Sequence, residues 1–291
     1  MKILAVCDDH PTSERIVAEL AHIAANTWAD VIMLGVQQPG NGNEPDPALA
    51  SRLLRCRDNF IRFFPATESP YGPCRISDAF VSFGRGRWLL APAERKGESR
   101  KKLTVRIRAG NPVREILSES RLQEVDLIIL GCSLAGDCRW LGGDLRRKIA
   151  SRAGCAVLVI RDLGQPPGSI SCFVGQGPVS QASLEMINQI ATVHQTDLSL
   201  VGLVGNELSA AGEERITQRM AGMLRYYAQR RIPAWIRLAL PENVEEDVRR
   251  AGRDGIIALL LGKKSLFGGI FPDDLIGRLV SGGQPAVLIL R

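Results

Sequence analysis

Polar residues and glycines that could take part in binding or catalysis follow the ends of apolar segments. Asp8 follows the first apolar run of the chain, and Gly131 and Ser133 follow a later one. Gly143 and Asp144 stand at the start of a segment with helical spacing. Glycines let backbone N–H groups converge on an anion, and a helix N-terminus points partial positive charge at it. Gly131 and Gly143 are thus of a residue type that could hold an anion, whereas the carboxylates of Asp8 and Asp144 would repel one.

The acidic residue of this set, Asp144, has two opposed interpretations. As a helix cap it contributes on the order of 1 kcal/mol to the helix. As a neighbour of a bound phosphate, its carboxylate would occupy or repel the phosphate position. We favour the capping role. Arg139, Arg146 and Arg147 lie nearby and would offset the acid, although arginines on helices are usually solvated.

The chain repeats itself, which indicates how these residues are positioned. An offset of 167 residues carries Asp30 to Asp197 and Gly35 to Gly202. Towards the end of each half the offset is 130 to 131, where CAVLVIR corresponds to PAVLILR. The difference places about 36 extra residues in the first half, between its second strand and the helix that begins NPVREIL.

Each half alternates short apolar runs with amphipathic segments, as is typical of strands buried on both faces and the helices that cover them. The predicted fold class is α/β, with two doubly wound, five-stranded parallel sheets in tandem. We expect domains over 1–162 and 170–291, joined by a linker at 163–169. The expected strands are 3–7, 31–36, 103–108, 126–130, 156–160, 170–174, 198–203, 235–238, 256–261 and 286–290. Two of the expected helices begin at residues 11 and 112. The others cover 46–64, 144–152, 184–191, 213–230, 244–251 and 273–281.

A basic insertion over about 65–102 follows the second strand of the first half. Residues 74–92 favour a hairpin with Gly84 to Gly86 at its tip, and the polar run 94–102 is expected to stay flexible. The strand at 103–108 alternates apolar and basic residues, which is typical of an exposed or edge strand.

Charge is concentrated in this region. From Gly84 to Arg108, nine basic and two acidic residues give a net charge of +7, so the rest of a chain with +6 in total carries −1. The basic residues are Arg85, Arg87, Arg95, Lys96, Arg100, Lys101, Lys102, Arg106 and Arg108. The simplest interpretation is a solvated excursion that could be excised by joining Pro65 to Leu103. The alternative is a surface that binds an acidic partner or an anionic surface.

Four segments in order, ILAVCDD, VRIRAGNPVREILSES, VDLIILGCS and LRRKIASRAGCAVLVIR, resemble the universal stress protein family across most of 1–162. Residues 170–291 resemble a second, more diverged copy. The resemblance implies a stress-response or regulatory protein. It also implies that the closing strands of the two halves pair within the chain, as single-domain members dimerise; pairing with a partner chain in a homodimer is the alternative.

The resemblance further implies an adenine nucleotide, ATP or AMP, in the N-terminal domain. The residues implied to hold it are Asp8, Val36, Gly131, Ser133, Gly143 and Asp144. The family's phosphate loop is degenerate here, because Leu134 stands where a second glycine is expected and Asp144 where serine or threonine is expected. The second half keeps less of the loop, with Gly175 in place of the aspartate.

We expect a non-enzymatic, cytoplasmic regulatory protein. No apolar run reaches the roughly 18 to 20 residues of a membrane span, and seven cysteines without a CxxC pair do not resemble a disulfide framework. No acid, base or metal set supports an enzyme. Two hypotheses stay open: a nucleotide whose occupancy alters an interface, or a nucleotide-independent scaffold that binds a transporter, enzyme or other protein partner through the insertion. Nucleic acid is not an expected partner.

Overall fold

The computed structural model describes residues 1–7, 12–39, 44–65, 69–71, 79–91, 100–132, 143–161, 167–174, 178–203, 210–240, 244–253, 255–260, 279 and 286–290. The chain divides into two compact units, Met1–Cys155 and Ala156–Arg291. No helix in these described segments is both long and apolar enough to cross a bilayer.

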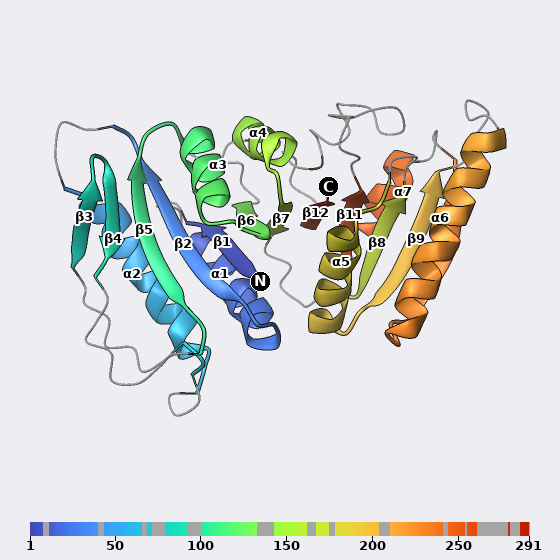
Figure 1. The fold of residues 1–291 in the computed structure, drawn as a ribbon, viewed down its shortest axis with the longest axis horizontal. Coiled ribbons are helices and arrows are strands. Elements are labelled where there is room, and N and C mark those ends of the chain that lie inside the picture. Colours follow the sequence, from blue (N-terminus) through green and yellow to red (C-terminus); the bar gives the residue numbers. More distant parts are fainter. Residues whose placement is uncertain are drawn as a thin grey trace. The chain divides into compact units, whose positions relative to one another are not determined.

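The first sheet is built around β1 (Lys2–Val6). This strand pairs in parallel with β2 (Asp30–Gln37) on one side and with β6 (Leu127–Cys132) on the other. β5 (Leu103–Ala109) pairs in parallel with the outer side of β2. The order β6-β1-β2-β5, which can be followed in Figure 1, is doubly wound: the chain builds outwards from β1 on one side and then crosses to the other.

Helices cover both faces of this sheet. α1 (Thr12–Asn26) and α2 (Pro47–Arg62) pack against each other, and α3 (Pro112–Leu122) packs against α4 (Gly143–Arg152). Two of these helices begin where the sequence places a cap and a proline. The side chain of Asp46 accepts hydrogen bonds from the backbone at the start of α2, and Asn111 does so at the start of α3.

The second unit repeats the strand order. β8 (Ser169–Val174) lies between β9 (Asp197–Leu203) and β11 (Gly255–Leu260), with β10 (Ala234–Ala239) beyond β9 and β12 (Ala286–Leu290) beyond β11. All four pairings are parallel. Its described helices are α5 (Gln181–His194), α6 (Ala210–Gln229) and α7 (Val244–Ala251). Of the helix expected over 273–281, only Leu279 is described.

The predicted fold class is confirmed. The repeated glycines of the two halves, Gly35 and Gly202, have the same packing role in each unit. A Cβ atom at Gly35 would lie 2.8 Å from Leu53 of α2, and one at Gly202 would lie 2.5 Å from Met220 of α6. Both distances are too short for a real Cβ contact. Each glycine therefore lets the helix that follows the second strand lie close against the sheet.

The closing strands of the two halves lie against each other, as expected. β7 (Ala156–Arg161) pairs antiparallel with β12, with Leu158 opposite Leu288. Both strands fall in the second compact unit. Because their side chains are almost wholly apolar, this pairing removes two edges that would otherwise favour aggregation.

The insertion extends the first sheet, which corrects two expectations. β3 (Phe80–Gly84) and β4 (Arg87–Leu90) form the expected hairpin, but β4 also pairs antiparallel with β5, and Trp88 lies opposite Ile107 (Figure 1). The prediction that the strand at 103–108 is an exposed or edge strand is wrong, because β4 covers its hydrogen-bonding edge. The prediction of a solvated excursion is wrong for Trp88, Leu90 and Lys101, which are buried, whereas Arg85 and Arg87 are exposed.

Candidate functional site

The carboxyl ends of β1, β2 and β6 meet at one edge of the first sheet. Val6, the last residue of β1, lies in register between Leu34 of β2 and Leu130 of β6. Val36 and Gly131 come just beyond these two neighbours and flank the end of β1. The structure thus brings two of the predicted site residues to the same edge, and Val36 is only half buried there.

The other predicted site residues are only partly described. Asp8 and Ser133 lie outside the described residues. Gly143 and Asp144 are the first two residues of α4, so Asp144 stands inside the first helical turn. A carboxylate in the first turn interacts favourably with the helix dipole. Because α4 begins at Gly143, Asp144 lies inside the helix and not at the N-cap position that we expected for it.

Gly131 has a packing role that the sequence did not reveal. A Cβ atom at this position would lie 2.0 Å from Cδ1 of Ile16 on α1. Ile16 is itself almost fully buried. A larger residue would force the Ile16 side chain or α1 to shift, so the glycine suits helix packing whether or not a ligand binds.

A buried cation lies at the same edge. Arg146 of α4 is 3% exposed, and its Nη1 is 3.4 Å from the backbone oxygen of Gly131, to which it donates. The prediction that this arginine is solvated is wrong, because it shares the buried side of α4 with Ile149 and Ala150. The next residue, Arg147, is exposed as expected. A guanidinium fixed at a strand end is a suitable donor for a phosphate or carboxylate.

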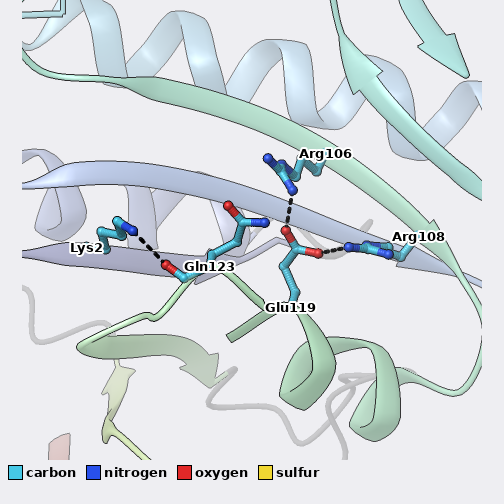
Figure 2. A network of polar contacts seen from close by, with 5 residues as sticks. All are labelled: Lys2, Arg106, Arg108, Glu119 and Gln123. Carbon is cyan, nitrogen blue, oxygen red and sulfur yellow. Dashed lines mark hydrogen bonds and ion pairs between the residues drawn. The ribbon is translucent and has the colours of Figure 1, made fainter. Parts of the chain in front are cut away.

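Arg106 and Arg108 of β5 form a buried ion network with Glu119 of α3 (Figure 2). Nη1 of Arg106 donates to Oε1 of Glu119 at 2.6 Å, and Nη2 of Arg108 donates to Oε2 of the same carboxylate. Glu119 of α3 is fully buried and Arg108 is 2% exposed. The network joins β5 to α3, the helix that follows it in the chain. It also means that two charges of the predicted basic surface are used inside the unit.

The hairpin completes the surroundings of these arginines. The ring centroid of Phe83, on β3, lies 5.9 Å from the guanidinium carbon of both Arg106 and Arg108. Within the described part of the chain, Nε and Nη1 of Arg108 have no hydrogen-bond partner. The sequence carried a signal for this network that we did not use: Glu119 lies three residues after the buried Ile116, on the apolar side of α3.

Two lysines bind the carboxyl ends of helices. Nζ of Lys101 donates to the backbone oxygens of Ala24 (2.8 Å) and Thr27 (2.6 Å), at the end of α1. Nζ of Lys2 donates to the backbone oxygen of Gln123 at 2.9 Å, at the end of α3 (Figure 2). A cation at a helix C-terminus satisfies free carbonyl groups and complements the dipole.

Lys101 belongs to the basic insertion but is 5% exposed. The rings of Trp28 and Tyr71 each lie 5.7 Å from its Nζ, and the hydroxyl of Tyr71 donates to the backbone oxygen of Ala29 at 2.8 Å. Burial lowers the pKa of Lys101. Burial also raises the pKa of Tyr71, and the negative charge of Asp30 raises it further. These residues tie the insertion to the end of α1.

The second unit repeats one element of the ion network. Arg237 of β10 corresponds to Arg106 at an offset of 131, and its Nη1 donates to Oδ1 of Asp247 on α7 at 2.7 Å. Gly175 and Gly262, which correspond to Asp8 and Gly131, lie outside the described residues. The described segments contain no group of three or more His, Cys, Asp or Glu side chains that could hold a metal ion.

Comparisons with known proteins establish the fold. No family model and no curated protein matches the sequence. Among solved structures, a universal stress protein from Archaeoglobus fulgidus DSM 4304 has a TM-score of 0.60 at 10% identity, covering 100% of this chain and 96% of that one. A putative universal stress protein from Pseudomonas aeruginosa UCBPP-PA14 has a TM-score of 0.59 at 13% identity, covering 99% and 92%.

The cytoplasmic domain of a prokaryotic cation chloride cotransporter also resembles the chain, with a TM-score of 0.53 at 14% identity, covering 99% of this chain and 94% of that domain. The likeness to each structure extends over almost the whole chain, so it includes both halves of the repeat. The chain therefore has the fold of these universal stress proteins.

Proposed function

We propose that this protein is a non-enzymatic regulator that binds an adenine nucleotide, ATP or AMP, at the carboxyl edge of its first sheet. The observation that carries the proposal is the buried guanidinium of Arg146, held beside the backbone of Gly131 at the end of β6. It supplies a fixed positive charge for phosphate groups where the glycine loop is degenerate. Structures with the same fold are named universal stress proteins, which supports a role in a stress response.

The geometry of the edge supports the adenine part of the ligand as well. Val36 is half exposed at the end of β2 and offers an apolar surface on one side of β1. On the other side of β1, Nη1 of Arg146 contacts the backbone of Gly131 at the end of β6. In open α/β sheets, ligands bind outside the carboxyl ends of the strands. An apolar base and a charged phosphate chain would therefore find suitable neighbours on opposite sides of β1.

The proposal includes no turnover. Val36, Gly131 and Arg146 offer an apolar side chain, a backbone segment and a cation. None of these groups takes a proton from water at neutral pH. Bound nucleotide would act by its occupancy, in a reducing compartment such as the cytoplasm, to which seven cysteines without a CxxC pair are suited.

A nucleotide-independent scaffold is the second candidate. The contact between Gly131 and Ile16 favours it, because that contact accounts for the glycine without any ligand. A partner would then meet the basic side chains that remain exposed around the hairpin. Those described are Arg85, Arg87, Arg100 and Lys102.

Titration calorimetry with ATP distinguishes the two candidates. We expect measurable but weak binding to the full chain, at least tenfold weaker binding to Arg146→Gln, and unchanged binding to Arg147→Gln, an exposed arginine one residue away. Asp144→Ser should strengthen binding, because it removes a negative charge from the start of α4. If neither ATP nor AMP binds the full chain or Asp144→Ser at millimolar concentration, the nucleotide proposal is wrong and the scaffold stands.

A further inference from the structure

The outer strand of the second sheet presents apolar side chains to solvent. β10 ends the strand order of its unit, and its register with β9 is continuous from Ala234 to Ala239. Trp235 is 46% exposed, Ile236 39% and Leu238 56%. An exposed, regular, apolar edge strand is a template for pairing with another strand.

The first unit shows what covers the equivalent edge. At an offset of 131, Ile236 and Leu238 correspond to Val105 and Ile107 of β5. Ile107 lies opposite Gly35, just as Leu238 lies opposite the corresponding Gly202. Yet Val105 is 2% exposed and Ile107 is fully buried.

The difference in exposure has a visible cause. β5 is covered on its outer side by β4, an antiparallel strand that places Trp88 opposite Ile107. The second half of the chain has no insertion at the corresponding point. β10 therefore has the surface of a strand that lacks its neighbour.

β10 also lacks the features that protect the outermost strand of the first unit. There, β3 is interrupted by a register shift between Ser82 and Gly84, and a bulge of this kind bends an edge away from further pairing. β10 contains no glycine, proline or register shift. The charge of its single ionic residue, Arg237, is paired with Asp247 of the same unit. An incoming apolar strand would meet no unneutralised charge from β10.

We infer that a second copy of this chain covers β10, through antiparallel pairing of the two β10 strands about a two-fold axis. β10 has the composition of the strand that covers β5, since each combines a tryptophan with aliphatic residues. Residues directly opposite each other in an antiparallel pair lie on the same face. The Ile236 and Leu238 side of one copy would therefore meet the same side of the other.

Pairing of two β10 strands gives a closed dimer, which distinguishes it from the other strand pairings available to this chain. Two β10 strands form an isologous contact in which both copies use their exposed edge at once. Pairing of β10 with β3 of another copy would be head-to-tail and would leave open edges for further addition. The bulge in β3 disfavours that contact.

Sedimentation velocity of the full chain tests the inference. We expect a dimer of twice the 31.7 kDa of one chain at micromolar concentration, and at least a tenfold weaker dimer for Leu238→Lys. Leu122→Lys is the matched control, because Leu122 is a 60% exposed leucine at the end of α3, and this variant should dimerise as the parent does. Circular dichroism checks that Leu238→Lys is folded, which its exposed position favours.

Hydrogen exchange of the parent chain gives a readout that needs no variant. Amides within 234–240 should be protected at high protein concentration and should exchange faster on dilution below the dissociation constant. A parent chain that is monomeric at tens of micromolar overturns the inference and leaves the edge to a strand of another protein. A dimer that Leu238→Lys does not weaken, with exchange in 234–240 independent of concentration, also overturns it.

Discussion

Glu119 connects two arginines that would otherwise repel each other inside the first unit. Its carboxylate is fully buried and accepts from both Arg106 and Arg108. In a poorly solvated position the loss of one partner is more costly than the pair is stabilising, because a charge is left uncompensated. The residue thus matters for the stability of the unit more than its distance from the candidate site would indicate.

We predict that Glu119→Gln lowers the free energy of unfolding by about 3 to 5 kcal/mol, as is typical when one member of a buried ion pair is removed. Chemical denaturation followed by circular dichroism measures this change. The control is Glu246→Gln, which removes a carboxylate that pairs with Arg250 and is 66% exposed. The control should lose less than about 1 kcal/mol. Equal losses in the two variants would mean that Glu119 does not hold Arg106 and Arg108 in a buried ion network.

Cys172 makes stability depend on alkaline pH. It is completely buried on β8, and burial raises the pKa of its thiol from 9.0 to about 12. Between these values the unfolded chain has lost the proton and the native chain has kept it. The free energy of unfolding therefore falls as pH rises through this window, and the stability that the thiol contributes is fully present only below pH 9.

We predict that Cys172→Ala has a shallower loss of stability with pH than the parent, by about 1.4 kcal/mol per pH unit above the unfolded pKa. Urea denaturation at pH 8, 9.5 and 10.5 measures the slopes. The comparison of slopes cancels the constant cost of the smaller side chain. Burial raises the pKa of Tyr227 in both proteins, and the charge of the Cys172 thiolate raises it further in the parent alone, so this coupling adds to the steeper slope of the parent. Parallel slopes would contradict the assignment.

At the scale of the elements, the insertion is part of the fold. β4 covers β5, and Lys101 closes the end of α1. The expectation that a chain with Pro65 joined to Leu103 would fold and keep its arrangement no longer holds. Such a chain would expose the edge of β5 and leave Val105 and Ile107 partly uncovered.

We predict that Lys101→Met lowers the free energy of unfolding by about 1 to 3 kcal/mol, because it leaves the carbonyl groups of Ala24 and Thr27 without their donor. Lys102→Met is the matched control, since it changes the adjacent lysine, which is exposed, and should be nearly silent. Thermal unfolding of both variants decides the matter. A silent Lys101→Met would mean that the end of α1 does not depend on the insertion.

The positions of helices and strands were predictable because apolar periodicity is local. The caps at Asp46 and Asn111 and the hairpin around Gly84 to Gly86 also followed from local residue preferences. The burial of Arg106 and Arg108 was not predictable in the same way. Whether alternate basic residues of a strand face water or a helix depends on what packs against them, here a carboxylate on α3 and a hairpin from the insertion.

The candidate site shows the same division. Its location at the strand ends followed from the order of the motifs, and Val36 and Gly131 lie at that edge. The burial of Arg146 could not be predicted from the sequence, because its neighbour Arg147 has the same side chain. Only the packing of α4 makes one arginine buried and leaves the other exposed. The roles of Asp8 and Ser133 stay predictions.

At the scale of the whole molecule, the chain contains two copies of one α/β plan that differ most at their outer edges and at their strand ends. The first unit carries the hairpin and the buried arginine of the candidate site. In the described part of the second unit, no strand pairs with the outer side of β10. This division of features is what we expect of a regulator in which one unit senses a ligand and the other meets a partner.

The most direct test of this account is to identify the nucleotide that the protein retains. The purified full chain is brought to equilibrium with ATP across a dialysis membrane, and the excess nucleotide on the protein side is identified and quantified by mass spectrometry. We predict that intact ATP is recovered, that it does not convert to ADP over hours, and that Arg146→Gln retains much less than Arg147→Gln. Recovery of no nucleotide, or of ADP formed faster than in buffer, would contradict a non-enzymatic nucleotide-binding regulator.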